Sequence, residues 1–369
     1  MCSLLIFRYC SIDILIIEFY LKFRSLIQCQ PLAVYTYIIN FKDSKMNKFP
    51  QSFSEANERI GNAIHHVCLN ALDAKFIKSN IQESYQSWAN VLYDRVFLNW
   101  GLCDKKIYRE LSSLNFDFST VSFFPHVYGQ SLLFYLIRPL IKIHFFNKRL
   151  LDVGCGNGVG LKISSELLKT RYALGIDLVN KLVTNSNNNF YIEDKINYMQ
   201  ADAENMAIAN ESFDIVTNLE SSHLYPQIEH FFSEVERVLA PNGFFCYVDV
   251  NFDVKRQAER FETFVKTRKN LRIIEKHNIT KMIQASIYQR LIVNEKRFYQ
   301  LAQYLLGPDK INYTSELANV ASSMGLMFLP WWRIRFKNPA LQALGKFARR
   351  CKHWNKKYYF YYLIQKIDS

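Results

Sequence analysis

Residues 150–160 read Leu-Leu-Asp-Val-Gly-Cys-Gly-Asn-Gly-Val-Gly, a short apolar run that gives way to a glycine-dense turn. An amphipathic stretch follows. Glycine at the end of a strand lets the backbone adopt positive φ and approach a bound molecule with no Cβ in the way. The stretch therefore predicts a strand, a tight turn and a helix, with Gly154, Gly156 and Gly158 facing a ligand. We expect Gly160 to let the helix pack closely.

Apolar segments alternate with amphipathic ones after this turn. Strands are predicted at 149–154, 171–177, 195–200, 213–219 and 243–249, with helices at about 158–169, 179–189 and 227–239 between them. Near-continuous apolar strands that alternate with helices indicate an α/β, Rossmann-like, doubly wound sheet. Later runs at 326–336 and 357–365 predict an antiparallel edge hairpin. Residues 256–306 show helical periodicity and no strand signal.

The chain of 369 residues is 49% apolar, which is enough for a sizeable core. Its composition divides it into five segments. Residues 1–45 form an N-terminal extension whose uncharged runs are short for a membrane span. It is either weakly membrane-associating or lies upstream of a true start at Met46, and we favour the second. The other segments are a helical N-terminal or lid region (46–145), a Rossmann-like core (146–255), a helical cap insertion (256–325), and edge strands with a basic segment (326–369).

The net charge of +13 is concentrated near the C-terminus. Residues 331–369 contain ten Lys and Arg side chains, and only Asp368 opposes them. Such an excess favours a polyanionic partner. No zinc-finger or RRM signature accompanies it, so we expect contact with an anionic membrane surface rather than with nucleic acid. The eight cysteines contain no C-x-x-C pair, and we expect reduced thiols in a cytoplasmic, at most peripherally membrane-bound, protein.

Two acidic residues follow the next two predicted strands. Asp177 ends the second strand, where a carboxylate can accept hydrogen bonds from both hydroxyls of a ribose. Asp202 follows the third strand and could accept from an adenine amino group. Because the carboxyl ends of parallel strands meet at one edge, these carboxylates and the glycine turn predict a site for an adenine nucleotide. Glu204 is a weaker candidate, and a surface position or a helix start also suits it.

The fourth predicted strand ends in Asn218-Leu219-Glu220-Ser221-Ser222-His223-Leu224-Tyr225-Pro226. A polar cluster in an apolar setting requires an explanation. His223 is the side chain there whose ordinary pKa suits a general base near neutrality. Glu220 could orient His223 or interact with a positive charge on the ligand. The alternative is that His223 only binds the backbone of its own loop.

These residues resemble class I S-adenosylmethionine (SAM) dependent methyltransferases of the methyltransferase-11 type. The resemblance rests on residues 151–158, Asp177, Asp202-Ala203-Glu204-Asn205 and Ser212-Phe213-Asp214, in order and spacing. Residues 96–101 and 218–226 are more closely similar to the phthiotriolone/phenolphthiotriolone dimycocerosates methyltransferase family, over roughly 88–366. Residues 220–223 also resemble a stretch of sterol C-methyltransferases. The N-terminal extension and the basic segment depart from these families.

The resemblance implies SAM as the methyl donor and an apolar lipid or polyketide-like hydroxyl as the acceptor. His223 would then take the hydroxyl proton as the oxygen attacks the methyl group. The expected cofactor-contacting residues are Asp152, Gly154, Gly156, Asn157, Gly158, Asp177, Leu178, Asp202, Ala203 and Asn218. Three alternatives stay open: a sterol- or quinone-like C-methyltransferase, a catalytically silent lipid-binding protein of this fold, and, more distantly, an NAD oxidoreductase.

Overall fold

The computed structural model describes residues 74–89, 99–114, 116–117, 127–251, 257–294, 328–334 and 357–368. These residues contain a seven-stranded sheet in the order β3-β2-β1-β4-β5-β7-β6. Its strands are β1 (Arg149–Val153), β2 (Tyr172–Asp177), β3 (Ile196–Gln200), β4 (Phe213–Leu219), β5 (Leu239–Asn251), β6 (Leu271–Asn278) and β7 (Tyr358–Lys366). The first five are parallel, and β7 runs antiparallel to both β5 and β6. The predicted α/β class and the antiparallel edge are confirmed.

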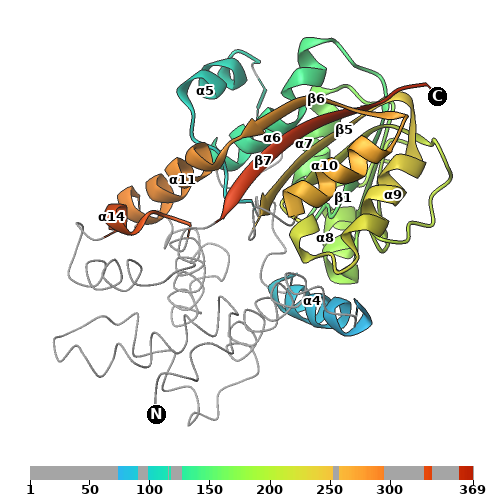
Figure 1. Cartoon of the computed structure of the whole chain (residues 1–369), viewed down its shortest axis with the longest axis horizontal. Coiled ribbons are helices and arrows are strands. Elements are labelled where there is room, and N and C mark those ends of the chain that lie inside the picture. Colours follow the sequence, from blue (N-terminus) through green and yellow to red (C-terminus); the bar gives the residue numbers. More distant parts are fainter. Residues whose placement is uncertain are drawn as a thin grey trace, which may run out of the picture.

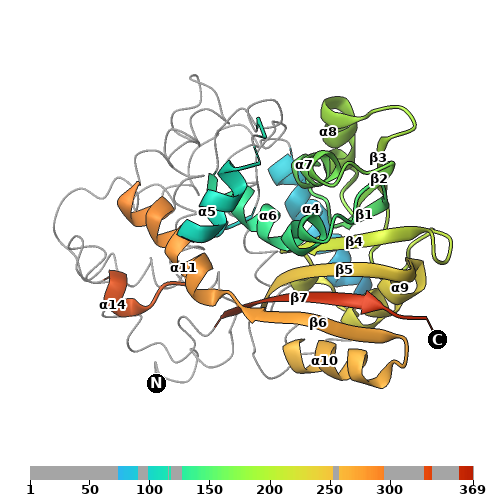
Figure 2. The same ribbon diagram turned by 90° about the horizontal axis from the view of Figure 1, so that it is seen from above.

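The central strands are apolar because helices cover both faces of the sheet. Leu150 packs into one core cluster and Leu151 into the other, since successive strand residues point to opposite faces. The first cluster includes residues of α6 (Val127–Lys142), α7 (Val159–Leu167) and α8 (Asn180–Phe190). The second includes residues of α9 (Ile228–Val238) and α10 (Gln257–Thr267). Figure 2 shows α6 and α7 on one side of the sheet and α9 and α10 on the other.

The edge hairpin exists, but its first strand is not the predicted one. Residues 328–334, inside the predicted strand 326–336, form a turn and the short helix α14 (Trp331–Ile334), which follows Pro330. The edge strand is instead β6, within the segment predicted to be purely helical. Residues of β6 are largely exposed and include the charged Arg272, Glu275 and Lys276, as is common at a sheet edge. Lys276, for example, pairs with Glu262 at 2.6 Å. This composition conceals the strand in the sequence.

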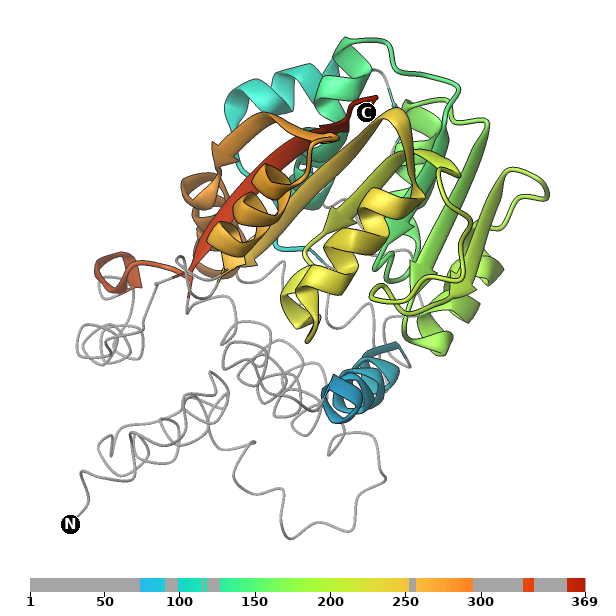
Figure 3. The same ribbon diagram turned by 45° about the vertical axis from the view of Figure 1, so that its right-hand side comes forward.

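Among the described residues, three helices precede the sheet. Besides α6, they are α4 (Ala74–Ala89) and α5 (Lys105–Ser112). After β6, α11 (Thr280–Tyr288) continues into a π-helical turn, η4 (Gln289–Val293). In Figures 1 and 3, α4 lies apart from α5 and α6, at the end of the sheet near α8. Within the region 46–145 that was predicted to be helical, residues 74–89, 105–112 and 127–142 are helices, and most of its remainder lies outside the described residues.

The N-terminal extension and most of the basic segment also lie outside the described residues, so the membrane contact expected of them stays a prediction. Of the three basic residues of this segment that the structure describes, Lys357 and Lys366 are buried. Lys366 Nζ donates to Leu239 O at 2.7 Å, and Lys357 Nζ lies 4.5 Å from the ring centre of Phe328. Both have structural roles. Among the described helices, none combines the length and the apolar character needed to cross a bilayer.

Candidate active site

The glycine turn after β1 has the predicted conformation. Gly154, Gly156 and Gly158 all have positive φ, at 73°, 56° and 82°. A Cβ on Gly154 would lie 2.3 Å from Ser221 Oγ, so no side chain fits there. Gly160 differs from the prediction, because a Cβ at this position would meet its neighbours only at ordinary contact distances of 3.7 Å. Close helix packing therefore does not require glycine at 160.

Asp177 connects the first two turns of the site. Its Oδ2 accepts from Gly156 N at 3.0 Å, and its Oδ1 accepts from Val179 N at 2.9 Å. Burial raises the pKa of Asp177 to about 6, although these backbone hydrogen bonds oppose the shift. Carboxylate oxygens carry two acceptor sites each. Asp177 can therefore hold the turn and still accept from a ligand.

Asp152 and Asn218 join β1 to β4 beneath the turn. Asp152 Oδ1 accepts from Thr217 Oγ1 at 2.7 Å, and burial raises the pKa of Asp152 to about 6. Asn218 is fully buried, and its Nδ2 donates to Val153 O at 2.9 Å and to Ser221 Oγ at 2.7 Å. Its Oδ1 is buried and has no hydrogen-bond partner within the described part of the chain. A buried acceptor without a donor is costly unless a ligand supplies one.

The turn after β3, which contains Asp202, contacts helix α4. Asp202 Oδ2 lies 2.5 Å from Lys78 Nζ, and its Oδ1 accepts from Glu204 N at 3.0 Å. Leu178 O accepts from Gln82 Nε2 of the same helix at 3.1 Å. Ala203 packs its methyl group into the second core cluster, which leaves only its backbone for a cofactor. Asn157 is buried within the turn.

His223 forms a dyad with Asp249, at the carboxyl end of β5. Its Nδ1 lies 2.7 Å from Asp249 Oδ1, and its backbone N donates to Asp249 Oδ2 at 2.9 Å. Burial alone would lower the pKa of His223, but the charge of Asp249 and its hydrogen bond outweigh burial and raise it. The sequence analysis missed Asp249. Its position at the end of a predicted strand, like that of Asp177, was the available signal.

The orienting role considered for Glu220 therefore belongs to Asp249. Glu220 Oε2 accepts from Trp100 N at 3.0 Å, and Arg290 Nη1 of η4 donates to Trp100 O at 2.8 Å. Glu220 Oε1 is buried with no hydrogen-bond partner in the ranges that the structure covers. Burial raises the pKa of Glu220 to about 7. The second role considered, interaction with a positive charge, stays a prediction.

Comparison with known proteins identifies the central domain. Residues 151–247 match the sequence model of the family described as "Methyltransferase domain". The chain is 34% identical over 113 residues to a phthiotriol/phenolphthiotriol dimycocerosates methyltransferase of Mycobacterium leprae, a match that covers 31% of this chain and 42% of the relative. It is 37% identical over 102 residues to a fatty-acid O-methyltransferase of Mycolicibacterium smegmatis, covering 28% and 37%. The chain thus spans less than half the length of these curated relatives.

Among solved structures, the [4+2]-cyclase SpnF has the same fold. It superposes with a TM-score of 0.52 at 14% identity, over 79% of this chain and 97% of the cyclase. A protein of this fold that is named as a cyclase shows that the fold alone does not establish methyl transfer. The residues of the site and the family match carry more information about the chemistry.

Residues 151–247 are thus a methyltransferase domain, of the kind found in SAM-dependent methyltransferases, and SAM is its cofactor. The site fits that molecule. The three glycines keep the turn at positive φ, the carboxylate of Asp177 lies at the end of β2, and the Oδ1 of Asn218, unpartnered among the described residues, offers an acceptor to a donor such as the methionine ammonium. No group of three His, Cys, Asp or Glu side chains in the described ranges could hold a metal ion.

Proposed function

We propose that this protein is a methyltransferase that transfers the methyl group of SAM to a hydroxyl oxygen of an apolar, lipid-like molecule. The observation that carries the proposal is the hydrogen-bonded His223–Asp249 dyad at the ends of β4 and β5, in a loop whose Ser221 lies against Gly154 of the glycine turn. The names of the two relatives, a phthiotriol/phenolphthiotriol dimycocerosates methyltransferase and a fatty-acid O-methyltransferase, support this class of acceptor.

His223 acts as the general base in this proposal. When bound, SAM supplies an electrophilic methyl group on a positively charged sulfur. Because Nδ1–H donates to Asp249, Nε2 is the nitrogen that takes the hydroxyl proton. The carboxylate of Asp249 then stabilises the imidazolium that forms. A positioned base of this kind contributes about 10²–10⁴-fold to the rate. Alignment of oxygen, carbon and sulfur and exclusion of water contribute the rest.

The acceptor group determines how much the base matters. A hydroxyl must lose its proton during the attack, whereas a fatty-acid carboxylate is already ionised at neutral pH. His223 is therefore required for an alcohol or a phenol and dispensable for a carboxylate. The requirement for His223 therefore distinguishes methylation of a hydroxyl from methylation of a fatty-acid carboxylate, the acceptor that the name of the second relative indicates.

The test is transfer of a radiolabelled methyl group from SAM by the full chain to four acceptors: a long-chain alcohol, an alkyl phenol, a fatty acid and a sterol. We expect label in the alcohol or the phenol and its loss in His223→Ala, with the affinity for S-adenosylhomocysteine (SAH) unchanged. Label only in the fatty acid, or at a carbon of the sterol, would contradict the proposed acceptor. Binding of SAH without any labelled product would favour the catalytically silent alternative, and binding of NAD instead of SAH would overturn the proposal altogether.

A further inference from the structure

Helix α4 lies outside the matched domain, yet it contacts the two turns expected to hold adenosine. Lys78 Nζ reaches Asp202 after β3, and Gln82 Nε2 reaches Leu178 O after β2. At the end of the helix, Ala89 packs in a small cluster with Val179 and Leu182. Lys78 and Gln82 are one turn apart and thus lie on one face of α4. Figure 3 shows α4 at this end of the sheet.

Lys78 lies between two carboxylates. Its Nζ is 2.5 Å from Asp202 Oδ2 and 2.6 Å from Glu204 Oε2. The side chain of Glu204 is 2% exposed, and that of Asp202 is 33% exposed. Glu204 Oε1 also accepts from Gln227 N at the start of α9, so its position is fixed. Two neighbouring carboxylates disfavour each other's ionised form, and a cation between them offsets that repulsion.

We propose that Lys78 is a positioning residue for the adenine end of the cofactor, and that it holds the Asp202 carboxylate in the orientation that accepts from the adenine 6-amino group. This inference rests on the proposed function, because it requires SAM in the site. It gives α4, which lies outside residues 151–247, a role in orienting Asp202 toward the cofactor.

The contacts of Asp202 leave room for the ligand. Its two oxygens offer about four acceptor sites, and Lys78 and Glu204 N occupy two of them. A third of the side chain is exposed, so one side of the carboxylate remains open. Lys78 and the adenine amino group can therefore bind the same carboxylate together.

The experiment compares the affinity of the full chain for SAH with that for its 6-deamino analogue, in which hydrogen replaces the adenine amino group. We expect wild type to bind SAH about tenfold more tightly than the analogue, as for a hydrogen bond to a charged group. Lys78→Met should weaken SAH about tenfold and leave the analogue nearly unchanged. Lys78→Arg should restore most of the difference.

Two variants of α4 provide controls. Lys75→Met makes the same substitution at an exposed position of the helix and should change neither affinity. Gln82→Ala loosens α4 without touching Asp202, and should weaken both ligands by the same factor. Isothermal titration calorimetry gives all of these values, and circular dichroism confirms that each variant is folded.

Three outcomes would overturn the inference while leaving the proposed function intact. Lys78→Met could bind both ligands as wild type does, weaken both equally as expected of Gln82→Ala, or bind SAH more tightly, which would make Lys78 a competitor of adenine. Failure of wild type to bind SAH at all would instead contradict the proposed function. The two failures are therefore distinguishable.

Discussion

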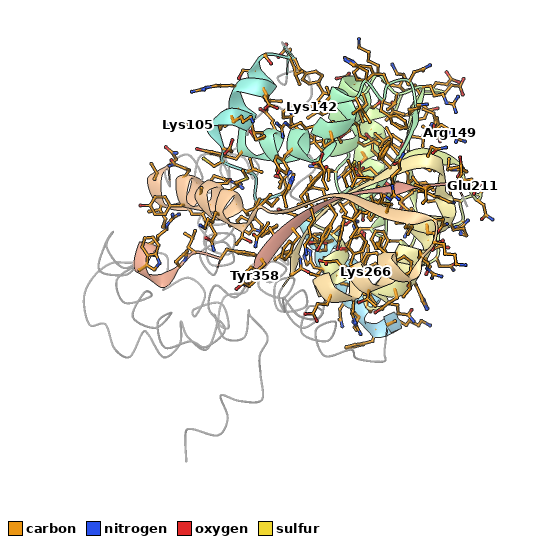
Figure 4. All side chains as sticks on the ribbon, turned by 45° about the horizontal axis from the view of Figure 1, so that its top comes forward. Lys105, Lys142, Arg149, Glu211, Lys266 and Tyr358 are labelled. Carbon is orange, nitrogen blue, oxygen red and sulfur yellow. The ribbon has the colours of Figure 1, made fainter. Side chains whose placement is uncertain are left out.

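The charged side chains at the two ends of the parallel strands differ in whether the protein itself supplies their partners. At the amino end, Arg149 donates to Asp214 through its backbone N and its guanidinium, at 2.8–3.1 Å. Lys366 reaches Glu211 at 3.1 Å. Figure 4 places Arg149 and Glu211 near one end of the sheet and Tyr358, at the start of β7, near the other. The charges at the amino end have protein partners, and they stabilise the fold.

At the carboxyl end, burial opposes the ionised form of several acids. The pKa values of Asp152 and Asp177 are raised to about 6, and that of Glu220 to about 7. Asn218 Oδ1 and Glu220 Oε1 have no hydrogen-bond partner among the described residues. Polar groups left in this state destabilise the protein and are expected where a ligand will complete them. The difference separates structural polar groups from functional ones.

The dyad at the carboxyl end gives the largest expected effect. His223→Ala should lower kcat on a hydroxyl acceptor by about 10²–10⁴-fold. Asp249→Asn should lower it less, and should also move the acid limb of the kcat/KM profile to lower pH. The sign follows because Asp249 raises the pKa of His223, and His223 acts in its neutral form, which is present above that pKa. An unchanged acid limb in Asp249→Asn would exclude His223 as the base.

Substitutions in the glycine turn change the shape of the carboxyl end without changing its charge. Gly154→Ala should abolish measurable SAH binding and lower the free energy of unfolding by about 2 kcal/mol, because φ is positive and Cβ would clash with Ser221. Gly160→Ala is the matched control. Its new methyl group makes only ordinary contacts, and alanine favours the helix, so stability should equal or exceed that of wild type. Normal SAH binding by Gly154→Ala would contradict the site.

Removal of an amino-end partner should affect stability but not binding. Arg149→Met should lower the free energy of unfolding at pH 7 by about 2 kcal/mol, since it leaves Asp214 without its main partner. Although burial alone raises the pKa of Asp214, the hydrogen bonds from Arg149 hold it below its usual range. The loss should therefore shrink as the pH falls below about 4 in urea titrations.

Two further measurements complete this prediction. Arg171 lies 3.8 Å from the same carboxylate with a side chain that is 55% exposed, so Arg171→Met should change stability by less than about 0.5 kcal/mol. SAH affinity should equal that of wild type in both variants. A large loss of SAH affinity in Arg149→Met would contradict the view that the amino end of the strands serves stability and only the carboxyl end serves binding.

The smallest expected effect concerns Glu220. If its carboxylate interacts with the sulfonium, Glu220→Gln should lower the affinity for SAM severalfold at pH 8 and leave that for SAH unchanged, because SAH has no positive sulfur. The pKa of Glu220 is about 7, so wild type should lose the same preference for SAM as the pH falls from 8 to 6. Equal changes in the affinities for SAM and SAH would mean that Glu220 only holds the Trp100 backbone and does not interact with the sulfonium.

The sequence predicted the parallel core because its signals are local. The apolar runs of β1 to β4 and the glycine turn each identify their own element, and their carboxyl ends must meet. The edge could not be predicted in the same way. Strand β6 is charged and exposed, so its composition resembles that of a solvated helix. The strands β6 and β7 are separated by 79 residues, so their pairing depends on tertiary contacts that a local sequence pattern does not predict.

The candidate site shows the same division. Asp177, Asn218 and His223 were predicted from their places after strands, and the structure brings their elements together. Lys78 was not predicted, because it comes from a distant element and carries no motif. Asp249 ends a predicted strand, but no motif marks it as the partner of His223. Only the hydrogen bonds to His223 and Asp202 reveal them.

The position of β7 between β5 and β6 has a consequence for biosynthesis. Strand β5 pairs with β7 through Phe244–Asn251, and β6 joins the sheet only through β7. While residues up to 357 leave the ribosome, an apolar strand therefore presents an unpaired edge, which is prone to association with other chains. Folding of the nascent chain can therefore be completed only after Tyr358–Lys366 has been translated.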